Sequence, residues 1–335
     1  MTWGETLAYR RGALGWSQER LAQQLGITRQ TLIALEHDKR LPTLALAIKL
    51  ASLFDLSLDE LVKPLANSIE RTDHWRWFGA KPSFPTLVVW AKIHDATVLV
   101  PTMLLAAPRL PDALWNPESG VLTPLPSARD PQRVMLIGGC DPYLAWLRDL
   151  YEEKRPGYWM EPIRLSSQAA IAAFTQGLLH VAGSHLFDAS TGQYNLIDFP
   201  MAVTRLHYLT WDEGLIRHPE ATEVRQIAIR EPGSEAHSLF LRHQGRISWP
   251  PDMFYSHQSI LEQVQHHPDW AGVGLGSLAA TCGLIFEAWA QESYDLWIRT
   301  ENLKSVWGRT LLEVLASTAL HDLFSQIPHL ALSGS

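Results

Sequence analysis

The sequence predicts an N-terminal all-α domain of five short helices, followed by a β-hairpin connection and an α/β domain. Three observations support this fold class. The 335 residues exceed the ~150 that are typical of one domain. Short, well-capped helical patterns fill about the first 65 residues, and strand and helix patterns alternate after residue 134, which is typical of parallel βαβ units. We therefore expect domain limits at 1–65, 66–132 and 133–330.

The second and third helices are expected within WSQERLAQQLGITRQTLIALEHDKR, residues 16–40. Ser17 is a good helix N-cap, and Gly26 ends that helix because glycine tolerates the left-handed conformation of a C-cap. Thr28 caps the next helix, and Leu32 and Leu35 share its buried face. The opposite face carries Arg29, Gln30, Ile33 and His37.

The other elements before residue 134 are less regular. Helices are expected over 4–14, after Pro42 in LALAIKLASLF, and over 55–62. Residues 65–84 are polar and contain glycine and proline, so they are expected to form a linker. Its His74, Trp75 and Trp77 are expected to pack on a neighbouring domain or a second subunit. Two apolar runs, TLVVWAKI and TVLVPTMLL, predict a hairpin, and residues 107–133 predict an irregular connection.

In the α/β part, each predicted strand is followed by a helix or a turn. Strands are expected over 134–137, 162–165, 178–182, 224–229, 272–275 and 294–299. Helices are expected over 141–153, 167–176, 234–243, 257–266, 307–317 and 320–326, the first with Asp141 as N-cap and Pro142 at the first helical position.

Four strand-to-helix junctions share small or hydroxyl residues: 138–142, 166–168, 232–234 and 274–277. In a parallel sheet these junctions lie at the carboxyl ends of the strands, where they can converge. Helix N-termini offer free N–H groups and positive potential, so together they suit an oxyanion or another small anionic molecule. The alternative is that each junction is simply a helix cap.

Composition limits the class of protein. No apolar run reaches the ~18 residues of a membrane span, and Cys140 and Cys282 are too few for a disulfide framework, so we expect a cytoplasmic protein without a membrane partner. The net charge is −7, but the first 66 residues hold eight Lys/Arg against seven Asp/Glu. An N-terminal domain with so little net charge releases few counterions when it binds DNA, so a single copy is expected to bind weakly. This favours a homodimer that binds two half-sites.

Residues 4–64 resemble the helix-turn-helix domain of phage repressors and the XRE family, on the strength of SQERLAQQLGITRQTLIALE and the basic loop after it. The resemblance implies sequence-specific binding to double-stranded operator DNA. Arg can bridge guanine and Gln can bridge adenine in the major groove, which suits the start of the third helix. The candidate DNA-binding residues are Gln18, Thr28, Arg29, Gln30, Thr31, Ile33, Lys39 and Arg40.

Residues 134–326 resemble a periplasmic-binding-protein-like domain related to the type 2 proteins that bind molybdate and tungstate. The matching stretches include GGCDPYLAWL, GLLHVAGSHLFDASTGQYN, REPGSEAHSLF and ESYDLWI. The resemblance implies two α/β lobes, chain crossings near 200–225 and 286–300, and a ligand cleft. Its candidate ligand-binding residues are Asp141, Ser166, Ser167, His185, Tyr194, Asn195, Arg230, Ser234 and Tyr294.

The sequence departs from that family at Glu235, where a small residue is usual, and at His237, where Arg is usual; residues 218–222 look shortened. A carboxylate beside an anion pocket repels the anion. These departures favour an unspecified small anionic or polar effector over molybdate itself.

Other chemistry is less well supported by the sequence. The 14 histidines show no zinc-type spacing, so no metal site is expected, and His180 is expected to be a satisfied core residue. We expect a ligand-responsive transcription regulator without enzymatic activity or cofactor. Two alternatives stay open: a regulator whose C-terminal domain has an empty cleft and only dimerises, and an enzyme that uses Cys140 or His185.

Overall fold

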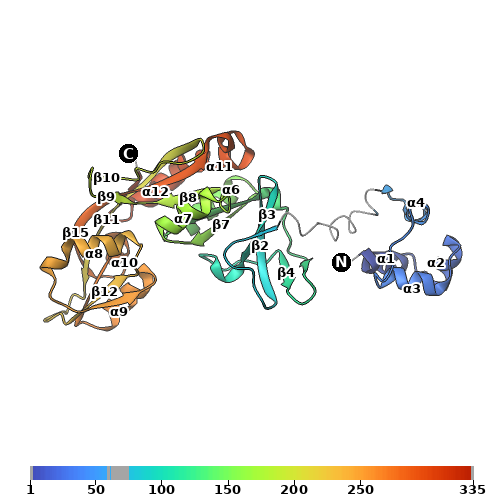
Figure 1. Ribbon diagram of the computed structural model, residues 1–335, viewed down its shortest axis with the longest axis horizontal. Coiled ribbons are helices and arrows are strands. Elements are labelled where there is room, and N and C mark those ends of the chain that lie inside the picture. Colours follow the sequence, from blue (N-terminus) through green and yellow to red (C-terminus); the bar gives the residue numbers. More distant parts are fainter. Residues whose placement is uncertain (1–2, 59–60, 62–74, 333–335) are drawn as a thin grey trace. The chain divides into compact units, whose positions relative to one another are not determined.

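The computed structural model describes residues 3–58, 61 and 75–332 (Figure 1). By their contacts they fall into two compact units, the N-terminal helices together with residues 119–126, and the strand-rich remainder. Each is described by itself, and residues 119–126 are given with the sheet whose strand order includes them.

The N-terminal unit is a small helical domain. Its helices are α1 (Trp3–Ala13), α2 (Gln18–Leu25), α3 (Arg29–Glu36) and α4 (Leu44–Leu53). Gly26 ends α2 at φ +71°, and the hydroxyl of Thr28 caps α3 by accepting a 3.1 Å hydrogen bond from the Thr31 N–H. Leucines from α2 and α3 are fully buried in one core with Trp3 of α1. The predicted helical pair is confirmed.

Two predictions lie partly outside the described residues. Of the helix predicted over 55–62, Leu58 and Leu61 are helical, and Leu61 is buried in the same core. Of the linker predicted over 65–84, only the part from Trp75 onwards is described. That part begins with strand β1 (Trp75–Trp77), and Trp75 and Trp77 both meet Trp115 edge to face at 6.3 and 5.4 Å. These tryptophans therefore pack on their own sheet.

That sheet has five strands in the order β1-β3-β2-β4-β5. Its further members are β2 (Thr86–Ile93), β3 (Ala96–Pro101), β4 (Ala113–Asn116) and β5 (Val121–Pro124). The predicted hairpin is the antiparallel pair β2–β3, which turns at His94 with φ +51°. Buried side chains of this pair share a core with Leu136 and Ile163, so the hairpin packs on the α/β domain.

The α/β domain is built on a nine-stranded sheet in the order β13-β12-β14-β11-β15-β8-β6-β7, with β16 paired to β11. Its first-lobe strands are β6 (Val134–Gly139), β7 (Trp159–Arg164) and β8 (Val181–Ser184). Its second-lobe strands are β12 (Gln226–Arg230), β13 (Pro251–Phe254) and β14 (Trp270–Leu275). Pairing within each of these sets of three is parallel, as the alternating pattern predicts.

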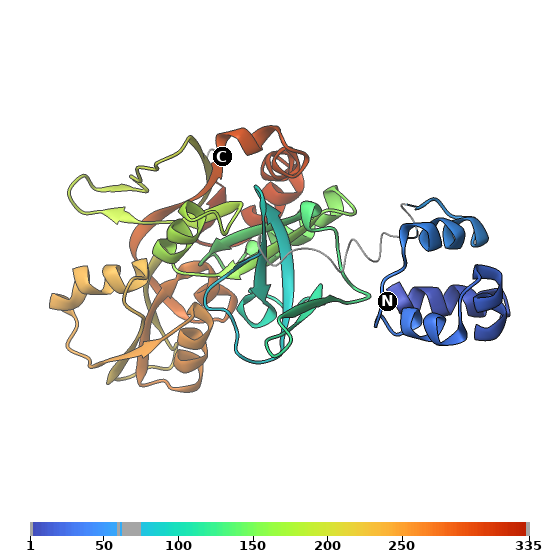
Figure 2. The same cartoon turned by 45° about the vertical axis from the view of Figure 1, so that its right-hand side comes forward.

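Helices cover each lobe. The first lobe has α6 (Leu144–Lys154), α7 (Ser167–Thr175), α11 (Val306–Leu315) and α12 (Thr318–Ser325). The second lobe has α8 (Glu235–His243), α9 (His257–His266) and α10 (Gly276–Thr281). Figure 2 shows the orange helices of the second lobe gathered apart from the green and red helices of the first.

Two long antiparallel strands join the lobes, β11 (Val203–Arg217) and β15 (Ile285–Arg299). β15 continues into the first lobe by pairing with β8, and β11 continues into the second by pairing with β14. Their ladder is interrupted between His207 and Leu209 and again between Glu213 and Gly214. The chain crossings expected near 200–225 and 286–300 are these strands. The short strands β9 (Phe187–Asp188), β10 (Gln193–Tyr194) and β16 (Leu330–Leu332) complete the chain.

Several element boundaries differ from the prediction. The helix predicted over 141–153 begins only at Leu144, because the Asp141 carboxylate accepts a 2.8 Å hydrogen bond from the Tyr143 N–H and holds a turn there. The irregular connection predicted over 107–133 contains β4 and β5. Strand β15 starts nine residues before the predicted strand at Tyr294, because its polar first half lies in the long ladder with β11.

Candidate functional site

The surface of the helical unit that the sequence assigns to DNA begins at α3. Thr28, Arg29 and Gln30 are exposed there, whereas Thr31 and Ile33 are half-buried. Thr31 also shares a 2.9 Å hydroxyl contact with Thr28. The first turn of α3 therefore presents one long cation and one amide to solvent, the two groups that can read base edges.

The other side chains predicted to contact DNA differ in whether they are exposed or already hydrogen-bonded within the helical unit. Lys39 and Arg40 are exposed in the loop that follows α3. Gln18 is half-buried, and its amide donates a 2.8 Å hydrogen bond to Glu36 Oε2. Arg11 Nε also donates to Glu36, at 2.6 Å. One of the two N–H donors of the Gln18 amide is thus engaged within the helical unit, and a phosphate contact needs the second donor or the backbone N–H.

In the α/β domain, three of the four predicted junctions converge at a narrow crevice between the lobes. Cys140 comes from the first junction, Ser166 and Ser167 from the second, and Ser234 from the third. His185, Arg230, Glu235, Ala236 and His257 complete the lining. The fourth junction does not reach the crevice, since Ser277 is fully buried and absent from its lining.

A larger cavity of about 410 Å³ adjoins the crevice and shares Cys140, Arg230 and His257 with it. Arg164 and Arg230 bring positive charge to its wall, and Asp141 brings a carboxyl group. The rest of the lining combines polar side chains such as Gln258 with apolar ones such as Leu261 and Leu278. Ligand sites of small molecules commonly have such volumes and such a mixture of apolar walls and a few polar groups.

The predicted ligand residues divide into two sets. The cavity walls contain Asp141, Ser166, Ser167, His185, Arg230 and Ser234. The remaining three line neither cavity: Tyr194, Asn195 and Tyr294. Asn195 is buried with φ +61° and donates to Asp295 at 2.5 Å, which anchors its loop to β15. Tyr294 is fully buried, and its hydroxyl lies where a Cβ on Gly139 would meet it at 1.9 Å.

The charged groups of the crevice are largely paired with neighbours. Arg230 donates from Nε and Nη2 to Glu231 at 2.7 and 2.8 Å. Glu235 accepts from Arg242 at 2.7 Å with one oxygen and from the Phe187 N–H at 3.3 Å with the other. Arg242 therefore offsets the repulsion that Glu235 was expected to exert on an anion. Burial raises the pKa of Glu235, although Arg242 acts in the opposite direction.

Asp141 lines the larger cavity and is 5 % exposed. Burial raises the pKa of Asp141 to about 7, against the lowering effects of the Tyr143 N–H and of His185. This carboxyl group therefore carries its full charge only above neutral pH.

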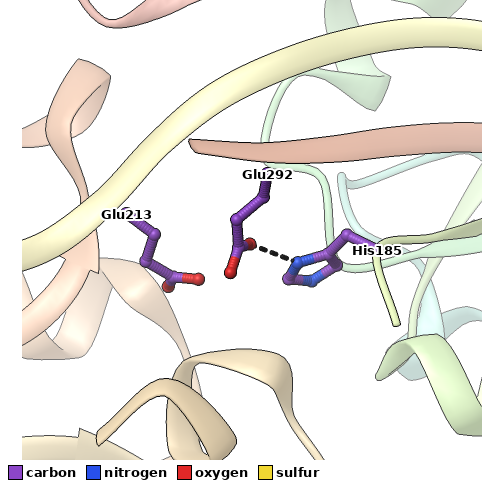
Figure 3. Close-up of side chains that lie close together, drawn as sticks. All are labelled: His185, Glu213 and Glu292. Carbon is purple, nitrogen blue, oxygen red and sulfur yellow. Dashed lines mark hydrogen bonds and ion pairs between the residues drawn. The ribbon is translucent and has the colours of Figure 1, made fainter. Parts of the chain in front are cut away.

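A chain of hydrogen bonds runs inward from the crevice. Cys140 Sγ lies 3.1 Å from His185 Nε2, and His185 Nδ1 lies 2.6 Å from Glu292 Oε2 (Figure 3). Burial lowers the pKa of His185, but Cys140 and Glu292 raise it more, so it lies well above the usual value. A thiol, an imidazole and an orienting carboxylate in this order are also the parts of a nucleophilic site.

His180 has the role that the sequence predicts. It is 5 % exposed, its Nδ1 accepts from the Leu136 N–H at 3.0 Å, and its Nε2 lies 3.0 Å from the Lys92 carbonyl oxygen. Burial lowers the pKa of His180 to about 4, which leaves it neutral. It is a satisfied core histidine.

Comparison with known families agrees with this architecture. The family model described as "PBP superfamily domain" matches residues 148–316, just over half of the chain and parts of both lobes. The chain belongs to the PBP superfamily. A second family model, "Helix-turn-helix", matches residues 7–61, which contain α2, α3 and α4.

The N-terminal unit of this PBP-superfamily protein is similar to HTH-type transcriptional regulators. It is 37 % identical over 51 residues to the regulator YgzD of Bacillus subtilis, covering 15 % of this chain and 77 % of YgzD. It is 42 % identical over 55 residues to a regulator of Methanocaldococcus jannaschii, covering 16 % and 83 %. The protein is thus a helix-turn-helix regulator with a PBP-like ligand-binding domain.

Solved structures with a similar chain course include a putative phosphate transporter substrate-binding protein with bound phosphate from Clostridium perfringens, at a TM-score of 0.49 and 14 % identity. That match covers 59 % of this chain and 99 % of the other. The regulatory domain of MetR, a LysR-family regulator from N. meningitidis, matches at a TM-score of 0.42 and 12 % identity, again over 59 % and 99 %. Within the described residues, no helix of this PBP-superfamily protein has the length and apolar character of a membrane span.

Sequence reasoning about the PBP-like domain missed Glu213, Glu292 and His257. His257 follows Ser256, the N-cap of α9, and so resembles an ordinary helix start. Glu213 and Glu292 lie on the strands that join the lobes, 28 and 107 residues from His185 in the chain. No local signal links residues so far apart, although a charged residue within a mainly apolar strand is itself a hint.

Proposed function

We propose that this PBP-superfamily protein represses or activates transcription by binding an operator through α3 and a small organic anion in its cleft. The observation that carries the proposal is the joint lining of one cavity by Arg164 and Arg230 beside the N-terminal ends of α6 and α9. Positive potential at these helix ends favours an anion. The cytoplasm is the compartment in which such a regulator meets its operator.

The size of the cavity supports an organic effector over a bare oxyanion. A volume of about 410 Å³ is within the range of small-molecule sites. Leu261 and Leu278 offer apolar contacts, which stabilise a bound organic molecule but not molybdate or tungstate. We therefore propose an organic anion as the effector, in preference to a metal oxyanion.

The effector is tested by thermal unfolding of the full chain with phosphate, molybdate, tungstate and a panel of small organic acids. A ligand at 100 times its Kd stabilises the native state by about 2.7 kcal/mol. We expect an organic acid to shift the midpoint, and R230Q to remove the shift. The matched control is R155Q, since Arg155 is an exposed arginine outside both cavities.

The other outcomes of this unfolding experiment would each favour a different function. A shift with molybdate or tungstate alone would make the protein a metal-oxyanion sensor. A shift that persists in R230Q would move the ligand out of this cleft. The absence of any shift, together with regulation that survives when residues 66–335 are replaced by an artificial dimeriser, would support an empty and purely dimerising domain.

We further propose that the protein acts as a homodimer. The first 66 residues hold eight basic against seven acidic side chains, so a single helical unit gains little from counterion release. Two units on inverted half-sites double the number of contacts. Sedimentation equilibrium of the full chain checks this, and a monomer at the concentrations that bind operator would contradict it.

The hydrogen-bonded series Cys140, His185 and Glu292 favours one second candidate, an enzyme that attacks its substrate with the Cys140 thiol. Alkylation by iodoacetamide separates this candidate from a plain regulator. An active-site thiol reacts much faster than Cys282, which is also half-buried and therefore a control within the same chain. Equal rates for the two cysteines would remove the enzyme candidate.

A further inference from the structure

Three buried side chains meet where β8 ends beside the two strands that join the lobes. They are His185, just after β8, Glu213 on β11 and Glu292 on β15. Figure 3 shows the two carboxyl groups facing each other, with the imidazole of His185 on the far side of Glu292. One nitrogen or oxygen from each of the three lies within 4.8 Å of the others, and all three residues are buried.

Glu213 is the member of this cluster that needs an explanation. It is completely buried, and neither oxygen of its carboxyl group has a hydrogen-bond partner among the described residues. A buried carboxyl group without a partner costs several kcal/mol if ionised, and such groups are rare in folded proteins. Burial and the neighbouring Glu292 carboxylate raise the pKa of Glu213, so a proton removes that cost when no ion is bound, and a metal ion would take the place of this proton.

Two other buried carboxylates of the same unit are paired with arginine. Asp295 accepts from Arg205 at 2.6 Å, and Asp112 accepts from Arg129 at 2.7 Å. The titratable group that faces Glu213 from the second lobe, His257, stays 3.9 Å away, and its Nδ1 also has no hydrogen-bond partner in the part of the chain that the structure describes. The side of the cluster nearest Glu213 therefore has unused ligand atoms from two residues.

We propose that His185 Nδ1, Glu213 and Glu292 bind one divalent first-row transition-metal ion. One imidazole nitrogen and two carboxylates are a donor set that suits Zn²⁺, Mn²⁺, Fe²⁺ or Co²⁺, whereas Mg²⁺ and Ca²⁺ prefer oxygen ligands alone. Two ligand atoms at about 2.1 Å from a tetrahedral metal lie about 3.4 Å apart. The present 4.8 Å spread must therefore close by about 1.4 Å, and the 2.6 Å contact between His185 Nδ1 and Glu292 must open by about 0.8 Å, when the ion binds.

Neighbouring groups already orient the ligands in the way that metal sites require. Cys140 Sγ lies 3.1 Å from His185 Nε2, which fixes the ring and leaves Nδ1 directed at the carboxyl groups. Trp211 Nε1 donates to Glu292 at 3.1 Å, and the Tyr194 hydroxyl donates to it at 3.4 Å. Such outer contacts hold ligand geometry and raise metal affinity. They also assign a role to Tyr194, which lines neither cavity.

The metal site does not rest on the proposed effector. Glu213 and Glu292 line neither the crevice nor the larger cavity. His185 alone is shared with the crevice, so an organic anion and the metal can be tested separately. Since the ligands come from the first lobe and from both joining strands, the ion would also fix the lobes to the ladder between them.

The experiment uses the full chain, treated with chelator, dialysed and titrated calorimetrically with Zn²⁺ alone and with Co²⁺ alone. We expect one ion per chain, visible d–d absorption for Co²⁺, and binding at least about 100-fold weaker for Mg²⁺. E213Q should weaken Zn²⁺ binding by about 100-fold or more while its near-ultraviolet circular dichroism stays that of the wild type.

A matched control is H207Q. His207 lies 2.9 Å from Asp295 on the same two strands, so it repeats the pairing of a histidine and a carboxylate outside the cluster. Its loss should leave Zn²⁺ affinity unchanged. Equal affinity in E213Q and the wild type, a larger effect of H207Q than of E213Q, or no binding of Zn²⁺ or Co²⁺ below millimolar concentration would each overturn the proposal. If E213Q fails to fold, the same titration of H185Q decides.

Discussion

Glu36 Oε2 accepts a 2.8 Å hydrogen bond from the side-chain amide of Gln18, and this contact joins the end of α3 to the start of α2. Arg11 completes the group from α1. Glu36 thus connects three helices of the DNA-binding unit through one nearly buried carboxylate. The angle between α2 and α3 depends on this residue as well as on the apolar core.

Replacing Glu36 by alanine should therefore destabilise the helical unit by about 1–3 kcal/mol, because Arg11 and Gln18 lose a partner that is mostly shielded from water. The midpoint of urea unfolding of the N-terminal helices, followed by far-ultraviolet circular dichroism, measures this. E19A is the control, since Glu19 is exposed in the first turn of α2. Equal loss in both variants would show that the shared contact contributes little.

Arg29 and Gln30 are exposed at the start of α3, so we expect each to read a base edge. R29A and Q30A should each weaken operator binding by about 1–3 kcal/mol and relax the sequence preference at one position. K39A should weaken binding to all sequences alike and lower the salt dependence by about one unit. Selection from a random DNA library followed by titration measures both effects. Unchanged preference in R29A and Q30A would contradict the assignment.

The pKa of Asp141 rises from 3.8 to about 7 on folding because the carboxyl group is buried. A raised acid pKa means that the folded state binds a proton that the unfolded state releases, so stability falls as pH rises between about 4 and 7 and is level above that. D141N removes this loss and keeps an acceptor for the Tyr143 N–H. Its free energy of unfolding, relative to wild type, should rise by a few kcal/mol from pH 4 to pH 8. If the difference in unfolding free energy between D141N and the wild type does not change with pH, the raised pKa of Asp141 is contradicted.

Gly139 leaves room for the Tyr294 hydroxyl, since a Cβ there would lie 1.9 Å from it. G139A should destabilise the α/β domain by about 1–3 kcal/mol through overpacking. Y294F removes the hydroxyl, which has no hydrogen-bond partner within residues 3–58, 61 and 75–332, and should be nearly neutral alone. The double variant should recover most of the loss, because the next atom of the ring is 3.2 Å away. Additive losses in urea unfolding would show that the clash lies elsewhere.

Sequence reasoning was most successful where structure depends on neighbours in the chain. Ser17, Gly26 and Thr28 each act on residues at most four positions away, and their caps are present as predicted. The helix over His257–His266 has the predicted bounds for the same reason, with Ser256 as its cap. The domain limits 1–65, 66–132 and 133–330 and the assigned site residues stay predictions.

The parts that could not be predicted depend on pairing between distant strands. β11 carries polar residues such as Asp212 and Glu213 beside apolar ones. Its sequence therefore lacks the regular alternation of polar and apolar residues that would predict a strand of 15 residues. Likewise Tyr294 belongs to the family's ligand pattern by resemblance, yet here it packs against Trp211 with ring centroids 4.9 Å apart. Only the assembled sheet brings Glu213 and Glu292 to one point beside His185.

The ladder between β11 and β15 limits how the two lobes can move. A slide of one strand by a single residue would turn every side chain to the opposite face of the sheet, which the buried cores forbid. The lobes can therefore change their angle by twisting or bending this two-stranded ribbon, and the bulges near Leu209 and Gly214 are the positions where the ladder opposes this least. A signal from the cleft would leave the domain as a rotation of one lobe relative to the other.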